Sequence, residues 1–194
     1  MNKKNRSNKT VYIFLTFLCI AFWLTMVVAA AYKFVEKKYV YPLGYKKEII
    51  ATAEKYDIDA ALLFGIVKTE SGFNPQAVSV KGAVGLMQIL PSTGEYIAAQ
   101  KGVLNYDLFD VNTNLDFGVY YWKYLQQKFQ GSTETAAAYN AGEGTVGKWL
   151  KNDKYSDDGI RLKEIPYAET KSYVKKISES EKKYRKLYGK LLDK

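Results

Sequence analysis

Hydrophobic and polar positions divide the chain into one long apolar run and a succession of short amphipathic segments. The run covers residues 11–32 without a charge, and as a helix it would span about 33 Å, enough for a bilayer core. Residues 33–44, KFVEKKYVYPLG, follow it and predict a short stalk that Pro42 and Gly44 interrupt. From residue 45 onward, apolar residues recur mostly at helical spacing, which predicts a helical domain.

Capping and breaking residues mark the boundaries of these helices. The expected starts are Asp59, Pro91, Asn112 or Thr113, and Ser132, and the expected ends lie near Gly102, Gly131 and Gly142. Residues 71–85, SGFNPQAVSVKGAVG, are rich in turn formers and are expected to form a loop. A last helix is expected after Pro166. Because no run alternates with period two for long, the sequence predicts an all-α domain of about six to eight short helices over residues 45–190.

Composition removes several classes of catalytic and metal site. The chain has 194 residues, no histidine and one cysteine, Cys19, which lies inside the apolar run. Ser-His-Asp and Cys-His catalysis are therefore excluded, as are metal sites built from histidine or from several cysteines. Any metal site would need carboxylates alone, and none is expected. Without histidine, a carboxyl group is the most plausible carrier of a proton.

The net charge of +9 lies at the two ends of the chain. The first ten residues are basic, residues 33–168 balance 16 basic against 16 acidic residues, and residues 169–194 hold nine basic and four acidic ones. The basic residues before the apolar run predict a cytoplasmic N-terminus, a single membrane-spanning anchor and an extracytoplasmic remainder. A cleaved signal peptide remains the alternative, since Ala29 to Ala31 are small, although the run exceeds the roughly 7 to 15 residues usual for such a segment. A lipoprotein is less consistent, because Cys19 follows the bulky Leu18.

These patterns predict five parts of the chain. They are a cytoplasmic basic tail at 1–10, a transmembrane anchor at 11–32, a stalk at 33–44, a catalytic domain at 45–180 and a basic C-terminal helix or tail at 181–194. In the last part, Tyr184, Leu187 and Leu191 alternate with lysines and predict a solvated helix that could touch an anionic wall polymer. Nucleic acid is not an expected partner, because the charges lie beyond the membrane and no aromatic-rich binding motif accompanies them.

Three segments carry a specific resemblance. KTESGFNPQAVSVKGAVGLMQILPST (68–93), AAAYNAGEGTVGKW (136–149) and IPYAETKSYVKKI (165–177) resemble, in order and spacing, the signature segments of the soluble lytic transglycosylase (SLT) family, which is goose-type-lysozyme-like. The resemblance covers most of residues 45–180. It implies a lysozyme-like helical fold and cleavage of the β-1,4 bond between N-acetylmuramic acid and N-acetylglucosamine in peptidoglycan. It further implies 1,6-anhydromuramoyl ends and no cofactor.

Glu70 is the candidate catalytic residue. It closes a helix whose preceding residues Phe64, Ile66 and Val67 are apolar, and Ser71, Gly72 and Phe73 follow it. A carboxyl group between an apolar helix and a loop with little water has a raised pKa, so it can stay protonated and donate to a glycosidic oxygen. For an arbitrary glutamate a solvated helix end would be the better interpretation, and the surrounding motif reverses that preference.

The motifs contain no second carboxylate. Retaining glycosidases need one about 5 to 5.5 Å from the first, and inverting ones need one about 6.5 to 9.5 Å away. Glu143, Asp110, Asp116 and Glu134 are available, but each also fits a surface, helix-start or capping position. In the family, the muramoyl N-acetyl group or its C6 hydroxyl attacks the anomeric carbon, and the same glutamate then acts as a base.

The resemblance also implies residues that bind the sugar. Gln88 and Asn140 would hydrogen-bond N-acetyl groups, Ser79 would contact the muramoyl group, and Tyr139 would offer an aromatic face. Tyr173 is a weaker candidate because it also fits the core, and Asn74 is weaker because Asn-Pro is an ordinary turn. Met87 is expected to face the core. Leu90 stands where methionine is common in the family and keeps an apolar wall. The alternatives left open are a hydrolytic muramidase and a non-catalytic wall-binding scaffold of an envelope machine, with partner proteins unknown.

Overall fold

The computed structural model describes residues 3–192. Met1 and Asn2 of the expected cytoplasmic tail, and Asp193 and Lys194 of the expected C-terminal tail, lie outside the described residues. The chain divides into two compact units, Met1–Pro42 and Leu43–Lys194, which are described separately below.

The first unit is a long helix. It consists of α1, Lys3–Val35, and a π-helical continuation, η1, Glu36–Val40. The stretch Tyr12–Val40 is long and apolar enough to cross a membrane, with a mean hydropathy of 2.5 over its most apolar window. Thr16 and Thr25 donate hydrogen bonds to the carbonyl oxygens three residues earlier, both at 2.7 Å, so their hydroxyl groups are satisfied within the helix. The expected stalk at 33–44 is therefore helical as far as Val40, and the helix ends just before Pro42, which cannot continue it.

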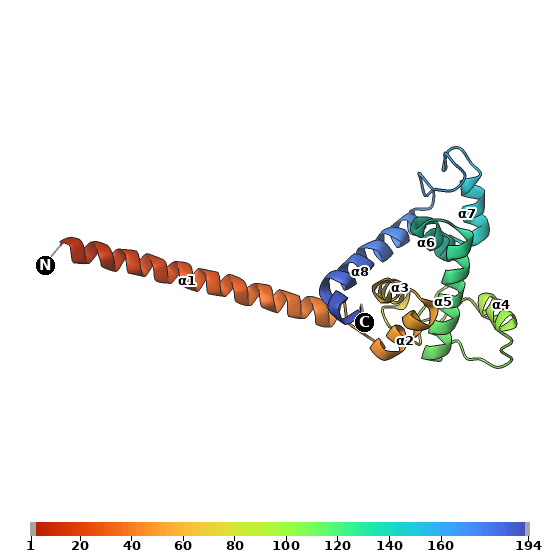
Figure 1. Cartoon of the computed structure of the whole chain (residues 1–194), viewed down its shortest axis with the longest axis horizontal. Coiled ribbons are helices and arrows are strands. Elements are labelled where there is room, and N and C mark those ends of the chain that lie inside the picture. Colours follow the sequence, from red (N-terminus) through yellow and green to blue (C-terminus); the bar gives the residue numbers. More distant parts are fainter. Residues whose placement is uncertain (1–2, 193–194) are drawn as a thin grey trace. The chain divides into compact units, whose positions relative to one another are not determined.

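The second unit is all-helical over its described residues, as expected. Its described residues form seven α-helices, labelled α2 to α8 in Figure 1. The described connections between them hold only isolated β-bridges, such as that between Val78 and Val84. The helices are α2 (Lys46–Tyr56), α3 (Ala60–Ser71), α4 (Pro91–Lys101), α5 (Val111–Lys128), α6 (Ser132–Ala141), α7 (Glu143–Leu150) and α8 (Ala168–Leu192). The turn-rich residues between α3 and α4 form the expected loop.

The packing of α3 against α8 organises this unit. The two helices are antiparallel, since Arg185 near the end of α8 pairs with Asp59 before α3, while Tyr173 near the start of α8 bonds to Glu70 at the end of α3. They approach closely at Gly65, where an added Cβ would lie 3.1 Å from the backbone nitrogen of Glu181. In Figure 1, α8 runs from α6 past α3 towards α2.

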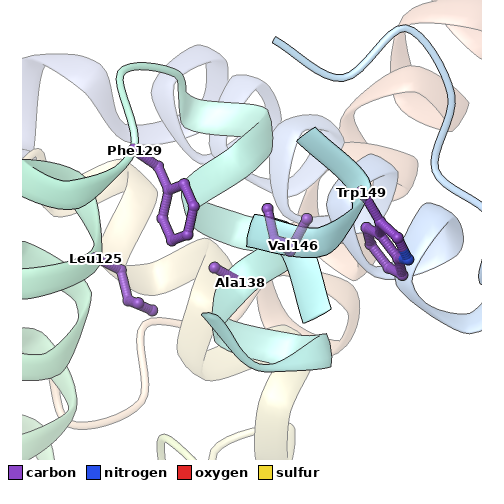
Figure 2. Packing of buried hydrophobic residues seen from close by; sticks show 6 residues of the cluster. Leu125, Phe129, Ala138, Val146 and Trp149 are labelled. Carbon is purple, nitrogen blue, oxygen red and sulfur yellow. The ribbon is translucent and has the colours of Figure 1, made fainter. Parts of the chain in front are cut away.

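A second apolar cluster joins α5, α6 and α7. Figure 2 shows Leu125 and Phe129 from α5 and its end, Ala138 from α6, and Val146 and Trp149 from α7. Burial of these side chains holds α6 in place, and α6 in turn carries Tyr139 and Asn140.

Several boundary predictions are confirmed and others are wrong. Asp59 caps α3 by accepting from the backbone nitrogens of Ala61 and Leu62 at 2.7 and 3.1 Å, and Pro91 opens α4, as expected. Ser132 does not cap α6, because it is already helical and Gly131 holds the cap position. Asp110 caps α5, which therefore begins at Val111, and α5 ends at Lys128 rather than near Gly131.

The C-terminal segment also differs from expectation. Residues 181–194 were expected to form a basic, solvated helix or tail. The helix that follows Pro166 does run through this segment as far as Leu192, but the segment is not solvated all round. Tyr184 is fully buried and its ring lies 5.3 Å from that of Phe64. Because Tyr173, Ile177, Ser180 and Tyr184 form one buried stripe at helical spacing, this segment belongs to the domain.

Candidate active site

Glu70 lies in the last turn of α3, at the edge of the core. The preceding residues Leu63 to Val67 are buried, and Gly72 ends the helix in the left-handed conformation, with φ +58°. Burial raises the pKa of the Glu70 carboxyl from 4.5 to about 7, and a hydrogen bond from Tyr173 partly opposes that rise. A carboxyl group with this pKa is protonated in a large fraction of molecules near neutral pH, as a general acid requires.

Tyr173 contacts the carboxyl group directly. Its hydroxyl donates a hydrogen bond to Glu70 Oε1 from the first half of α8. Burial, with the nearby Glu70 charge, raises the pKa of Tyr173 well above its ordinary value, so the hydroxyl stays a donor at every physiological pH. The same causes, burial first, raise the pKa of Tyr139 well above the usual range.

The loop after α3 forms one wall of the site. At its tip, the Ser79 hydroxyl accepts from the backbone nitrogen of Ala83 at 3.0 Å, and a tight turn joins Ser79 to Gly82. Gln88 has a positive φ of 51°, and its side-chain Nε2 donates to the carbonyl oxygens of Ala77 and Gly85 at 3.1 and 3.0 Å. The side-chain nitrogen of Gln88 therefore stabilises the loop, and the side-chain Oε1 remains available to accept a hydrogen bond from a ligand.

Asn114, in α5, holds this loop in place. It is 1% exposed, its Oδ1 accepts from the backbone nitrogen of Met87 at 2.7 Å, and its Nδ2 donates to the carbonyl oxygens of Val84 and Leu108 at 3.0 and 2.7 Å. Met87 is fully buried, as expected from the sequence. One buried amide thus fixes the backbone on both sides of Gly85.

Tyr139 and Asn140, at the end of α6, form part of the opposite wall. The hydroxyl of Tyr139 donates to the carbonyl oxygen of Met87 at 2.9 Å, so α6 and the loop are linked across the site. Asn140 Oδ1 accepts from the hydroxyl of Thr170 at 2.8 Å, which links α6 to the first turn of α8. The Nδ2 group of Asn140 forms no such bond with another described residue and remains available as a donor.

These walls enclose a cavity of about 360 Å³. Its lining residues are Glu70, Ser79, Val80, Lys81, Ala83, Gln88, Leu90, Tyr139, Asn140 and Glu169. The structure therefore places six of the eight candidate residues on the wall of this cavity. Tyr173 lies behind Glu70 as its hydrogen-bond partner. Asn74 does not line the cavity, and its Oδ1 accepts from the backbone nitrogen of Gln76 at 3.0 Å within a turn.

The sequence motifs did not indicate four of the lining residues, which are Val80, Lys81, Ala83 and Glu169. Val80 and Lys81 project from the turn that follows Ser79, and the sequence offered no signal for them beyond their proximity to it. Glu169 is exposed in the first turn of α8. A signal for Glu169 did exist, because it precedes Tyr173 by four residues and so shares its side of the helix.

The four carboxylates considered as partners for Glu70 do not line this cavity. Glu143 accepts from Lys128 at 2.7 Å and Tyr124 at 2.9 Å, and the bond from Lys128 holds the pKa of Glu143 below its usual value. Glu134 is buried rather than on the surface, and its Oε1 accepts from the backbone nitrogen of Leu162 at 2.7 Å. Both side chains therefore have structural partners.

The two aspartates are likewise engaged. Asp110 caps α5 through the backbone nitrogen of Thr113 at 2.8 Å, and this bond lowers the pKa of Asp110. Asp116 lies in a separate cavity of about 410 Å³ between α2 and α5. Burial raises its pKa, but hydrogen bonds from Lys101 and Lys55 outweigh that effect and leave the pKa lowered. Over residues 3–192, no cluster of three or more Asp, Glu or Cys side chains has the arrangement of a metal site.

Comparison with known proteins gives a consistent family. The profile of the transglycosylase SLT domain matches residues 47–161. Soluble lytic murein transglycosylase of Salmonella typhimurium is 34% identical over 155 residues, which cover 77% of this chain and 24% of that protein. Membrane-bound lytic murein transglycosylase C of Haemophilus influenzae is 34% identical over 166 residues, which cover 73% of this chain and 46% of that protein.

Solved structures agree in fold. The 70-kDa soluble lytic transglycosylase of Escherichia coli superposes with a TM-score of 0.67 and 31% identity over 77% of this chain and 25% of that one. The same scores hold for the complex of the 70-kDa soluble lytic transglycosylase with bulgecin A. This chain spans about a quarter to a half of the length of these relatives. From its profile match, its identity to these relatives and its lysozyme-like helical fold, the chain belongs to the transglycosylase SLT domain family.

Proposed function

We propose that this protein is a membrane-anchored lytic transglycosylase of peptidoglycan. It would cleave the β-1,4 bond between N-acetylmuramic acid and N-acetylglucosamine and leave a 1,6-anhydromuramoyl end. The observation that carries the proposal is Glu70, a carboxyl group with a pKa raised to about 7 on the wall of a cavity of about 360 Å³. The family relationship supports the same chemistry, since lytic murein transglycosylases are among its relatives.

Glu70 would serve first as acid and then as base. The protonated carboxyl gives its proton to the glycosidic oxygen as the bond from that oxygen to the anomeric carbon breaks, and the N-acetylglucosamine end leaves as an alcohol. The muramoyl C6 hydroxyl then bonds to the anomeric carbon and returns its proton to Glu70, either directly or after transient attack by the N-acetyl group. No water is consumed, and the carboxyl regains its proton. The hydrogen bond from Tyr173 stabilises the carboxylate between the two steps.

The cavity walls supply groups suited to an N-acetylated sugar. Asn140 offers an amide donor and Gln88 an amide acceptor, while Tyr139 and Leu90 give an aromatic and an aliphatic surface. Ser79 lines the same cavity as Glu70, where its hydroxyl would meet a muramoyl group. We assign these residues to substrate binding and Tyr173 to positioning of Glu70, with no cofactor or nucleic acid taking part.

One observation favours hydrolysis as a second candidate. Glu169 lines the same cavity as Glu70 and is exposed, so it could activate a water molecule in the manner of an inverting muramidase. Mass spectrometry of the products from intact peptidoglycan separates the two. Transglycosylation gives 1,6-anhydro ends, which are one water lighter than the reducing ends of hydrolysis. Reducing ends that disappear in Glu169→Gln would establish the muramidase instead.

The catalytic assignment has its own test. Glu70→Gln keeps the shape of the side chain and removes its proton transfer, so we expect product formation to fall by about 10²-fold or more. Asn112→Ala, an exposed change outside the cavity, is the matched control and should keep wild-type activity. Unchanged wall cleavage in Glu70→Gln would favour a non-catalytic, wall-binding scaffold for an envelope machine.

We further propose that residues 11–32 are retained as a single-pass anchor with a cytoplasmic N-terminus. The long uninterrupted helix and the membrane-bound relative support this proposal. The intact mass of the protein from isolated membranes should match the full chain. A shorter mass, with a new N-terminus near Ala31, would establish a cleaved signal peptide and a secreted enzyme.

A further inference from the structure

The C-terminal half of α8 carries a row of lysines on its exposed side. Lys182, Lys186 and Lys190 follow one another at intervals of four residues, so their ammonium groups lie along one side of the helix. All three side chains are exposed, and none forms an ion pair with another residue in the range 3–192. This row therefore presents positive charge to whatever adjoins it.

The acidic residues nearby on α8 are bound to other groups. Glu181 lies 3.4 Å from Arg185, which also pairs with Asp59 on the side of α8 that faces α3. Glu179 lies 3.8 Å from Lys175. The charge of the lysine row is thus not cancelled by acidic groups on its own helix.

The chain enters the domain from the membrane-spanning helix close to the C-terminal end of α8. Gly44, the second residue of the unit, packs against Phe73, because a Cβ on Gly44 would lie 3.0 Å from the Phe73 ring. The Phe73 ring is 6.2 Å from that of Phe64, which is 5.3 Å from the ring of Tyr184 in α8. Leu192, at the end of α8, lines a hollow together with α2. The entry point of the chain and the lysine row thus lie near the same end of the unit.

The connection to the anchor is short. Ten residues, 33–42, separate the uncharged run from Leu43. Fully extended they reach at most about 34 Å, and in helical form about 15 Å. Since residues 33–40 are helical, the chain itself keeps the entry point of the domain within a few nanometres of the bilayer surface.

We propose that Lys182, Lys186 and Lys190 rest on the anionic phospholipid headgroups of the membrane that holds the anchor. The inference rests on the anchored form given under Proposed function. Lysines near an anionic leaflet bind it electrostatically, and the attraction decays over a Debye length of about 10 Å at 0.1 M salt. The short connection at residues 33–42 keeps the domain near enough to the membrane for this short-range attraction to act.

The contact would also fix where cleavage takes place. Glu169, on the wall of the catalytic cavity, precedes Lys190 by 21 residues along α8, which corresponds to about 30 Å of helix. A domain seated on its lysine row would hold the cavity away from the headgroups. The enzyme would then act on glycan strands that lie above the membrane surface.

The test is a lysine footprint of the full chain in nanodiscs. An amine-reactive acylating reagent modifies accessible lysines, and mass spectrometry gives the rate at each site. In phosphatidylglycerol discs we expect Lys182, Lys186 and Lys190 to react about fivefold more slowly than in phosphatidylcholine discs, the factor that about 1 kcal/mol per lysine corresponds to. The protection should disappear at about 1 M salt, where the Debye length falls to about 3 Å.

The chain provides an internal control. Lys148, Lys151 and Lys154 are exposed in and after α7, next to α6 at the other end of α8, and should react equally in both kinds of disc. Equal rates at the α8 row in both kinds of disc would overturn the proposal. So would protection that appears in neutral discs when soluble poly(glycerol phosphate) is added, since that result assigns the row to an anionic wall polymer.

A matched pair of variants separates this inference from the catalytic one. K182Q/K186Q/K190Q and K148Q/K151Q/K154Q each remove three charges, and both should cleave solubilised peptidoglycan in detergent at the wild-type rate. If the three α8 lysines of the wild-type chain show no protection while cleavage is normal, only the membrane seating is wrong and the catalytic proposal stands. A chain that fails to enter the discs would overturn the anchor and the seating together, leaving the chemistry of Glu70 untouched.

Discussion

The hydroxyl of Tyr173 donates its hydrogen bond to Oε1 of Glu70, across the junction of α8 with α3. Two opposing effects therefore set the proton affinity of this carboxyl group. Burial disfavours the charge and raises the pKa, whereas the tyrosine hydroxyl stabilises the carboxylate and lowers it, with a net value of about 7. The balance suits a group that must release a proton and take one back within a single turnover.

The first prediction concerns the pH dependence of the rate. Because the first step needs protonated Glu70, kcat/KM should fall as the pH rises through about 7. Tyr173→Phe removes a group that stabilises the carboxylate, so the pKa of Glu70 rises further and the descending limb moves to higher pH. We expect kcat to fall by about tenfold, less than the 10²- to 10⁴-fold typical of the acid itself.

Steady-state kinetics between pH 5 and 9 on purified glycan strands would check this prediction. Tyr167→Phe is the control, because Tyr167 is exposed and its ring packs on Trp149 rather than on Glu70. A lower kcat in Tyr173→Phe with an unmoved limb would show that Tyr173 affects packing alone.

The second prediction concerns stability. The folded-state pKa of Glu70 lies above the ordinary 4.5, so its contribution to stability is complete below about pH 4.5 and is lost as the pH rises through about 7. Glu70→Gln does not titrate, so it should become more stable relative to wild type between pH 5 and pH 8. At about 1.4 kcal/mol per pKa unit, the upper limit of this gain is about 3 kcal/mol. The measured gain should lie below that limit, because the carboxyl keeps some contact with water.

Thermal unfolding in detergent at several pH values measures this difference, and Glu143→Gln provides a control of opposite sign. The pKa of Glu143 is lowered, chiefly by Lys128, so this carboxylate stabilises the fold above its unfolded pKa and loses that effect on acidification. Glu143→Gln should be less stable than wild type at pH 8, with a difference that shrinks at low pH. Equal behaviour of the two variants would contradict the assigned environments.

Much of the fold and the environment of the proposed acid, Glu70, could be predicted from the sequence, because both depend on local signals. Asp59 and Pro91 start helices through short-range chemistry, and both predictions are confirmed. The apolar residues before Glu70 indicated a desolvated carboxyl, and the structure places it on a partly buried helix end with a raised pKa. These features involve neighbours within a few positions along the chain.

The remainder depended on contacts between distant segments. Nothing near Tyr184 shows that Phe64 lies opposite it, so the last turns of α8 read as solvated. Likewise, Gln88 was expected to hydrogen-bond an N-acetyl group, and nothing in the sequence showed that its Nε2 group would donate to the carbonyl oxygens of Ala77 and Gly85 instead. Long-range packing overrides local pattern at both places.

A third prediction tests the loop at Gly85. This residue has φ +79°, and an added Cβ would lie 2.1 Å from Nδ2 of Asn114. Gly85→Ala therefore combines backbone strain with displacement of a buried hydrogen-bonding group, and we expect it to lower the free energy of unfolding by about 3 kcal/mol or more. Gly147→Ala, in α7 with no atom within 4 Å of an added Cβ, should leave stability unchanged or raise it by up to about 1 kcal/mol.

Chemical denaturation in detergent compares the two alanine variants. Wild-type stability in Gly85→Ala would mean that the Asn114 amide moves aside without cost, and that the loop is held by other contacts.

The last prediction concerns Asn114 itself. Asn114→Ala removes three hydrogen bonds and leaves the backbone nitrogen of Met87 and the carbonyl oxygens of Val84 and Leu108 without this partner. Each buried group left unsatisfied costs about 1 to 3 kcal/mol, so we expect a loss of about 3 to 5 kcal/mol in unfolding free energy. Asn112→Ala, an exposed change two residues away, should stay within about 0.5 kcal/mol of wild type.

Activity gives Asn114→Ala a second readout, because the residue holds a wall of the cavity that it does not line. A displaced loop would move Gln88 and Ser79 relative to Glu70, so KM should rise and kcat should fall, while the descending limb of the pH profile stays near pH 7. This combination differs from the effect expected for Tyr173→Phe, in which the descending limb of the pH profile moves to higher pH. A variant of normal stability and normal KM would show that Asn114 does not hold the loop in place.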